Sequence, residues 1–214
     1  MQRQVQIITM LALAVVLAVP AMAAEPGWTV RFYGARVKPT IDLRDADAQF
    51  PITVNSNGAL QAGAALEYRV RPWVGLSADA LHGRPEIVLE ADLPGGRRQA
   101  SDKVSFTPFT LGPVFHLTPG KAADLTLTAM IGFASYGDLV FGAGGERLSL
   151  DAGNAFCWGL GAAVDVRLGA SNWALHGGVR RYASTPEFTN RDNGAVGSTS
   201  FNSVVGTFGA AYRF

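Results

Sequence analysis

The sequence is poor in cysteine, in charge and in long apolar runs. Its single cysteine, Cys157, rules out a disulfide within the chain. Charged residues make up 16% of the sequence, against about 25% in ordinary soluble domains. The histidines and the cysteine show no zinc-binding spacing, and the glycines of residues 142–147 do not follow the strand–helix pattern of a phosphate-binding loop. We therefore expect no metal and no cofactor.

Only one long apolar run occurs, and it lies at the amino end of the chain. Residues 7–19 are nearly all apolar, follow the lone positive charge of Arg3, and end at Pro20. The run is shorter than the roughly 20 residues that a membrane-spanning helix needs. Because small residues follow at Ala21-Met22-Ala23, the pattern predicts a secretory signal peptide, residues 1–23, cleaved after Ala23.

The remaining chain, residues 24–214, is expected to form one domain without a helical membrane span. Its longest charge-free stretches, such as 104–120 and 152–164, are interrupted by Pro, Gly, Ser, Thr or Asn. Subtracting Arg3 from the 18 basic residues leaves 17 basic against 17 acidic residues, so we expect no nucleic acid as a partner. If such a chain lies in a membrane, a closed β-barrel is the remaining fold that satisfies every backbone polar group.

Apolar and polar residues alternate with a period of two in eight segments. Near the carboxyl end, Val204, Phe208 and Tyr212 fall on one face, whereas Thr207 and Arg213 fall on the other. This alternation predicts strands with one apolar face, as in transmembrane barrels. The predicted strands cover residues 28–38, 59–70, 73–82, 106–116, 123–136, 155–167, 173–182 and 204–214.

The connections between these strands alternate in length. Residues 69–73, 118–122 and 168–172 are short and rich in turn-forming residues. Longer polar segments, which we expect to be loops, cover 39–58, 83–104, 137–154 and 183–203. Short periplasmic turns and long extracellular loops are typical of outer-membrane proteins. The sequence therefore predicts an all-β fold, an eight-stranded antiparallel up-and-down transmembrane β-barrel, integral in the bacterial outer membrane.

Two sets of side chains are predicted to face the lumen of this barrel. The first set is charged: Arg31, Glu67, Asp79, Asp124, Asp165, Arg167 and Arg180. Because an eight-stranded barrel is just wide enough for side chains to fill, we expect these charges to pair and close the lumen to bulk water; the alternative is a polar constriction or ligand site. The second set would line an apolar pocket near the rims: Tyr33, Trp73, Leu81, Met130 and Tyr182.

Aromatic and cationic residues lie at the predicted strand ends. Tyr212 and Phe214 end the last strand, and a terminal aromatic is the signal that the outer-membrane assembly machinery is thought to read, which makes that machinery an expected partner. Arg36, Lys38 and Arg181 fall at extracellular strand ends. Arginine pairs well with phosphate, so outer-membrane lipids and lipopolysaccharide are expected partners, with a solvated rim as the alternative.

The three histidines give little support to an enzyme. None of His82, His116 and His176 occurs in a His-x-Ser pair, and nucleophilic catalysis needs a base within hydrogen-bond reach of a hydroxyl. We predict structural histidines, no catalytic residues and a protein that is not an enzyme.

Four stretches resemble the OmpW family of small outer-membrane barrels, with OmpA-like membrane barrels as the nearest confusable group. They read GWTVRFYGARVKPT, NGALQAGAALEYRVRPWVGLSADAL, WALHGGVRRY and GTFGAAYRF, whereas residues 82–103 depart from the pattern of that family. The resemblance implies an eight-stranded barrel that binds or passes small, mostly hydrophobic molecules across the outer membrane, and hence a small hydrophobic solute as a partner. The alternative function is a non-transporting structural or adhesive barrel with long extracellular loops.

Overall fold

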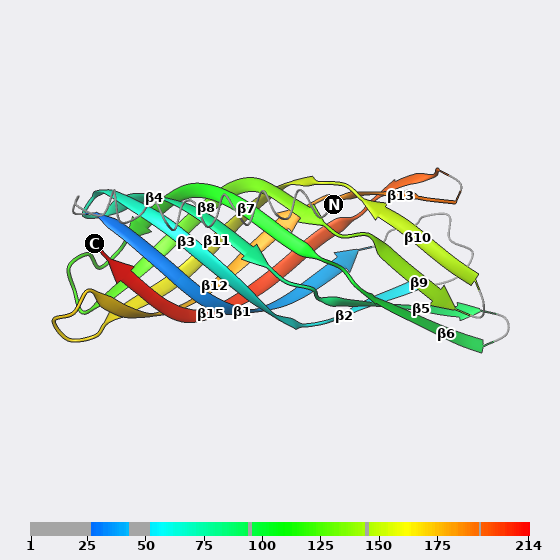
Figure 1. Cartoon of the computed structure of the whole chain (residues 1–214), viewed down its shortest axis with the longest axis horizontal. Coiled ribbons are helices and arrows are strands. Elements are labelled where there is room, and N and C mark those ends of the chain that lie inside the picture. Colours follow the sequence, from blue (N-terminus) through cyan, green and yellow to red (C-terminus); the bar gives the residue numbers. More distant parts are fainter. Residues whose placement is uncertain (1–26, 43–51, 94–95, 144–145, 193) are drawn as a thin grey trace.

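The computed structural model describes residues 27–42, 52–93, 96–143, 146–192 and 194–214. The predicted signal peptide, residues 1–23, lies outside this range. Figure 1 shows a long cylinder of tilted strands that continues at one end into a set of hairpins. No helix among the described residues is long and apolar enough to cross a membrane.

Eight strands close into a barrel, which confirms the predicted fold. In the order of their pairing around the barrel they are β1 (Trp28–Asp42), β15 (Ser200–Arg213), β12 (Trp173–Ser184), β11 (Ala155–Arg167), β8 (Ala123–Tyr136), β7 (Phe106–His116), β4 (Val74–His82) and β3 (Ala59–Arg71). Neighbours in this order pair antiparallel, and β1 closes the barrel by pairing with β15 from Thr29–Arg213 to Asp42–Ser200. Each strand overlaps one of the eight predicted segments.

Side chains along each barrel strand alternate between the lumen and the outer surface. On β7, Phe109 and Leu111 are exposed on the outside, whereas Thr110 and His116 are buried inside. A water-soluble barrel would have the opposite polarity. An apolar outer surface around a polar interior is the arrangement that a lipid bilayer requires.

Tight turns connect the strands at the end of the cylinder opposite the hairpins (Figure 1). Gly120, between β7 and β8, and Gly169, between β11 and β12, have φ angles of 79° and 62°. Only glycine adopts this left-handed region without strain, which explains the residue type at both turns. The carboxyl end of the chain lies at the same end (Figure 1).

The four long connections contain strands, so the expectation that they are loops was wrong. A three-stranded sheet contains β2 (Ile52–Asn57), β5 (Glu86–Leu93) and β6 (Gly96–Lys103), and a four-stranded sheet contains β9 (Leu139–Ala143), β10 (Glu146–Ala152), β13 (Glu187–Asn190) and β14 (Val196–Ser198). These strands form because the segments carry apolar residues that are buried, such as Ile87, Val104 and Phe141. We call the two sheets together the crown.

The two sheets of the crown meet between β6 and β9. There the backbone N–H of Val140 donates to Oδ2 of Asp102 at 2.6 Å. Because β6 and β9 belong to different sheets, no ladder of backbone hydrogen bonds joins them. We call this junction between β6 and β9 the seam.

Candidate functional site in the barrel lumen

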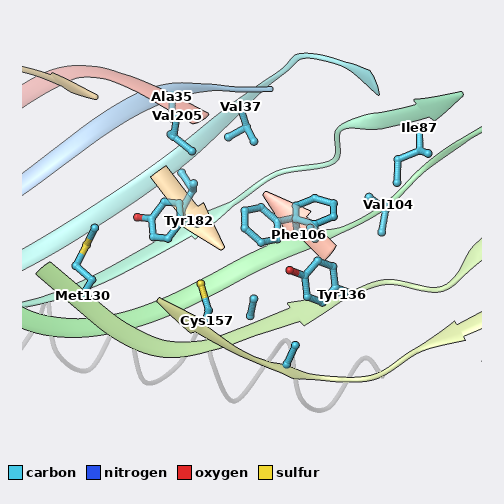
Figure 2. Packing of buried hydrophobic residues seen from close by; sticks show 14 of the residues in the cluster. Ala35, Val37, Ile87, Val104, Phe106, Met130, Tyr136, Cys157, Tyr182 and Val205 are labelled. Atoms are coloured by element: carbon cyan, nitrogen blue, oxygen red, sulfur yellow. The ribbon is translucent and has the colours of Figure 1, made fainter. Parts of the chain in front are cut away.

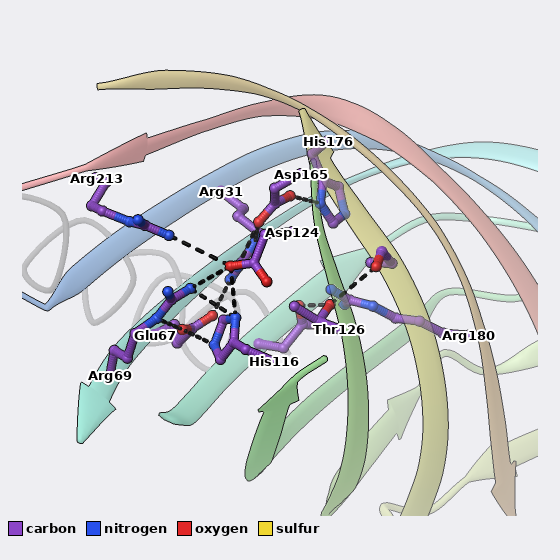
Figure 3. A network of polar contacts seen from close by, with 12 residues as sticks. Arg31, Glu67, Arg69, His116, Asp124, Thr126, Asp165, His176, Arg180 and Arg213 are labelled. Carbon is purple, nitrogen blue, oxygen red and sulfur yellow. Dashed lines mark hydrogen bonds and ion pairs between the residues drawn. The ribbon is translucent and has the colours of Figure 1, made fainter. Parts of the chain in front are cut away.

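Buried ion pairs fill the half of the lumen near the tight turns (Figure 3). Arg31, on β1, places Nη1 2.8 Å from Oε2 of Glu67 and Nη2 2.8 Å from Oδ2 of Asp165. Glu67 lies on the neighbouring strand β3, but Asp165 lies on β11, three strands away around the barrel. Arg31 therefore bridges the lumen.

A second cluster surrounds His116 on β7. Nε2 of His116 lies 2.8 Å from Oε1 of Glu67, and Nδ1 lies 2.9 Å from Oδ2 of Asp124. Arg69 donates from Nη2 to the same oxygen of Asp124 at 2.9 Å, and Nη2 of Arg213 lies 3.6 Å from it. Glu67 thus belongs to both clusters and joins them.

A third cluster lies towards the crown. Arg180, on β12, pairs with Asp79, on β4, on the other side of the lumen. Tyr33 donates to Oδ2 of Asp79 at 2.6 Å, and Tyr182 donates to Oδ1 at 3.2 Å. The guanidinium carbon of Arg180 lies 4.9 Å from the ring centroid of Tyr33, which adds a cation–π contact. These four side chains separate the charged half of the lumen from an apolar half.

Little space remains between the clusters. The cavity lined by Arg31, Asp79, His176 and Arg180 holds about 20 Å³, which is room for about one water molecule. Within the described residues, the charged half of the lumen is therefore a closely packed ionic layer, with room for about one water molecule in this cavity.

The lumen widens below this layer, at the end that carries the tight turns. A recess of about 230 Å³ is lined there by Lys121, Asp124, Asp165, Arg167 and Arg213. Arg167 lines this recess, as its predicted inward position requires, but it is exposed and forms no ion pair with the other charges among the described residues. It is the last residue of β11, where the barrel opens to solvent.

Buried apolar side chains gather in the crown half of the lumen (Figure 2), together with the buried polar side chains of Gln61, Ser184 and Ser203. Four of the five residues predicted to line an apolar pocket are buried there or at its lower boundary: Tyr33, Leu81, Met130 and Tyr182. The rings of Phe106, Tyr136 and Phe201 pack together with centroids 5.1–5.5 Å apart. The cluster also contains Cys157 and continues into the crown through Val104, Leu139 and Phe141. We call this region the apolar chamber.

Trp73 is not part of the apolar chamber, and its predicted inward position was wrong. It lies between β3 and β4 with 57% of its surface exposed. The pairing of β3 with β4 shifts register between Arg69 and Arg71. Pro72 and Trp73 form the turn between the two strands, so the alternation within β4, which begins at Val74, does not extend back to Trp73.

Sequence reasoning missed Arg69, which is central to the second cluster. Arg69 follows Glu67 by two residues on β3, so the same period of two places it on the inward face. The alternation of β3 therefore predicts an inward position for Arg69.

His116 and His176 were expected to be structural, and the structure places both inside the ionic layer.

His176 lies between an acid and a hydroxyl. Its Nδ1 is 2.8 Å from Oδ1 of Asp165, and its Nε2 is 3.3 Å from Oγ1 of Thr207. This order resembles a nucleophilic relay, but Thr207 is only 6% exposed and the nearby cavity has no room for a substrate.

No group of three or more His, Cys, Asp or Glu side chains in the described ranges is arranged to hold a metal ion.

Aromatic rings surround the outer surface at the end with the tight turns. Trp28 packs on Tyr68 with centroids 4.8 Å apart, and Tyr212 packs on both Trp173 and Phe214 at 4.9 and 4.8 Å. Such a girdle marks the membrane–water interface. Recognition of Tyr212 and Phe214 by the assembly machinery remains a prediction.

Four features together define the class of protein: the closed sheet, the apolar outer surface, the charged interior and the aromatic girdle. This is the architecture of an integral β-barrel of the bacterial outer membrane, the location that the sequence predicted.

Comparisons with known proteins agree with this class. No family model and no curated protein matches the chain. Among solved structures it is similar to OprG of Pseudomonas aeruginosa, with a TM-score of 0.62, 13% identity and coverage of 88% of this chain and 96% of OprG. It is also similar to AlkL, with a TM-score of 0.55, 17% identity and coverage of 89% of this chain and 90% of AlkL. Neisserial surface protein A is similar as well, with a TM-score of 0.53, 11% identity and coverage of 88% of this chain and 97% of that protein. OprG and AlkL belong to the OmpW family, so the predicted resemblance is confirmed at the level of the fold.

Proposed function

We propose that this barrel binds small, mostly hydrophobic molecules in its apolar chamber and passes them across the outer membrane. The observation that carries the proposal is the apolar chamber itself. Lumens of outer-membrane barrels are ordinarily polar, whereas here aromatic and aliphatic side chains continue from the crown into the barrel and stop at Asp79 and Arg180. An apolar solute gains about 25 cal/mol for each Å² of apolar surface that it buries there.

The seam between β6 and β9 offers an entrance to this chamber. Val104 directly follows β6, and Leu139 is the first residue of β9; both side chains belong to the apolar cluster. The two strands are joined by the Asp102–Val140 hydrogen bond rather than by a ladder, and one backbone hydrogen bond, from Gly137 N–H to the carbonyl of Ser105 at 2.8 Å, joins the chain segments next to them. The sheets can therefore part at this seam at low cost, and a solute that enters replaces contacts between apolar side chains.

An apolar molecule cannot replace the charge pairs of the ionic layer, so it cannot leave along the barrel axis. We propose that solutes leave sideways between β7 and β8. The pairing of these strands runs from Phe106 to Leu111 and resumes at Val114, skipping Gly112 and Pro113. Proline has no N–H to donate to a neighbouring strand, so the hydrogen-bond ladder between β7 and β8 is interrupted there, next to the Asp79–Arg180 pair.

A reversible crosslink tests the entrance. In a Cys157→Ser background, Asp102→Cys and Val140→Cys would lock the seam when oxidised. The barrel is placed in vesicles that carry lipopolysaccharide in the outer leaflet and enclose an alcohol dehydrogenase with its nicotinamide cofactor. Uptake of a small aromatic alcohol is followed by cofactor fluorescence. We expect the oxidised protein to lose the uptake seen after reduction.

The matched control crosslinks Asn57→Cys to Glu86→Cys, which are paired within one sheet and joined by a 2.9 Å hydrogen bond. This crosslink should not change uptake. Equal uptake in the oxidised and reduced seam variant would disprove the proposed entrance. Wild-type vesicles no faster than empty vesicles would disprove transport altogether.

The second candidate function is a structural or adhesive role. We propose no enzymatic activity. The packed ionic layer and the extended crown hairpins favour this candidate, because a barrel that only anchors exposed strands needs no path through its lumen. The absence of any uptake in the vesicle experiment would favour it over transport.

A further inference from the structure

Three outward-facing cations lie on two barrel strands, β1 and β12, which flank β15. Lys38 on β1 pairs with Val204 on β15, and Val204 pairs in turn with Arg181 on β12. Arg36 lies two residues before Lys38, on the same outer face of β1. All three side chains are exposed. The patch thus spans the outside of β1, β15 and β12, towards the crown.

These cations differ from the arginines of the lumen in having no counter-ion among the described residues. Arg31, Arg69 and Arg180 each pair with a carboxylate. In the described part of the chain, none of Arg36, Lys38 and Arg181 forms an ion pair or a side-chain hydrogen bond. The patch therefore has positive charge that can be neutralised from outside the molecule.

The patch lies at the height of the outer membrane interface. Arg181 and Val204 each lie eight residues from the girdle pair Trp173 and Tyr212. Eight residues span about 26 Å along a strand, or about 20 Å along the membrane normal at a tilt of about 40°. The apolar band of such barrels is about 25 Å tall, and long cationic side chains extend further to reach the interface.

Small residues lie below the cations on the same face. Gly34 and Gly177 both pair with Phe208, which is 69% exposed, and Gly206 lies opposite Arg36. A Cβ atom added at Gly177 or Gly206 would meet no other atom within 4 Å. The outer surface is therefore recessed beside the ring of Phe208, in the part of the wall that faces lipid chains.

The other side of the barrel lacks this combination. Phe109, Phe133 and Phe156 are exposed on β7, β8 and β11, where their rings face lipid. The cations and the recess thus mark one face of the barrel rather than a uniform rim.

We infer that the outer face of β1, β15 and β12 binds lipopolysaccharide. Arg36, Lys38 and Arg181 bind the phosphate groups of its lipid part, and one acyl chain lies in the recess beside Phe208. Cations at the interface attract phosphate, and arginine also binds it through two parallel hydrogen bonds. This inference concerns the outer wall and does not depend on the proposed transport through the lumen.

Binding of purified lipid A to the barrel in lipid nanodiscs tests the inference. The probes are hexa-acylated lipid A with both phosphates, the same lipid without phosphates, and phosphatidylglycerol, with affinities measured by native mass spectrometry. We expect the combined variant Arg36→Gln, Lys38→Gln, Arg181→Gln to bind phosphorylated lipid A on the order of 100-fold more weakly than wild type. Arg84→Gln with Lys103→Gln, which removes two exposed cations of the crown, should bind it like wild type.

A second variant tests the recess. Gly206→Leu fills it while keeping the three cations, so it should weaken the binding of hexa-acylated lipid A but not that of a phosphorylated lipid A analogue without acyl chains. Unchanged binding by the triple variant would overturn the inference, as would equal wild-type affinity for phosphorylated and phosphate-free lipid A. Equal affinity for phosphatidylglycerol would overturn the assignment to lipopolysaccharide.

Discussion

Glu67 links two clusters of the ionic layer. Its Oε2 lies 2.8 Å from Arg31, its Oε1 lies 2.8 Å from His116, and its side chain is fully buried. Removing one partner of a buried ion pair leaves the other charge uncompensated, which costs more than the pair contributes. The stability of the barrel should therefore be sensitive to single neutral substitutions in this layer.

Glu67→Gln keeps the shape of the side chain and removes its charge. We expect the free energy of unfolding to fall by about 3–5 kcal/mol, measured by urea titration of the barrel in lipid vesicles. Glu187→Gln is the matched control, because Glu187 is exposed, and it should change stability by less than about 0.5 kcal/mol. An equal, small effect of both substitutions would mean that the ionic layer does not hold the barrel together.

Cys157 reports on water in the apolar chamber. Its side chain is buried in the aromatic cluster, so a charged maleimide should not label it in the folded barrel and should label it after unfolding. Ser171→Cys in a Cys157→Ser background places a thiol in an exposed turn and should react at once. Rapid labelling of Cys157 in the folded protein would show that water fills the chamber.

At the scale of whole elements, the strands of the barrel could be predicted and the crown could not. Each barrel strand is buried on one face only, so its residues alternate with a period of two, and the predicted bounds differ from the observed ones by a few residues. In the crown, Ile87 and Val88 are both buried, so alternation fails, and β13 and β14 are too short to show any period. The position of Trp73 could not be predicted because the alternation continues through Trp73 in the sequence, whereas β4 begins one residue later and Trp73 lies in the turn.

The pairing of β1 with β15 closes the barrel and brings two backbones very close at Gly209. A Cβ atom at this position would lie 2.0 Å from the carbonyl oxygen of Phe32. Gly209→Ala should therefore force the strands apart and lower stability by about 1–3 kcal/mol, with a lower refolding yield. Gly206→Ala, three residues away with no atom near its Cβ, should refold like wild type. Equal stability and refolding yield of the two variants would contradict the close approach of β1 and β15 at Gly209.

At the scale of the whole molecule, the ionic layer should prevent ion flow. The cavity inside it holds only about 20 Å³, and its charges are paired. Single-channel recording in a planar bilayer should therefore show no steady conductance for the wild-type barrel. A stable ohmic channel would contradict a sealed lumen, although it would leave the closed sheet itself in place.

The central claim is that the apolar outer wall of the barrel faces lipid, whereas its interior does not. Measuring the surroundings of successive residues along β15 tests this most directly. Nitroxide labels are placed one at a time from Val204 to Phe208, in a Cys157→Ser background in lipid bilayers, and collisions with oxygen and with a polar nickel complex are measured. The account predicts high oxygen access at positions 204, 206 and 208, and low access to both reagents at 205 and 207. Equal access along the strand, or nickel access at positions 206 and 208, would contradict it.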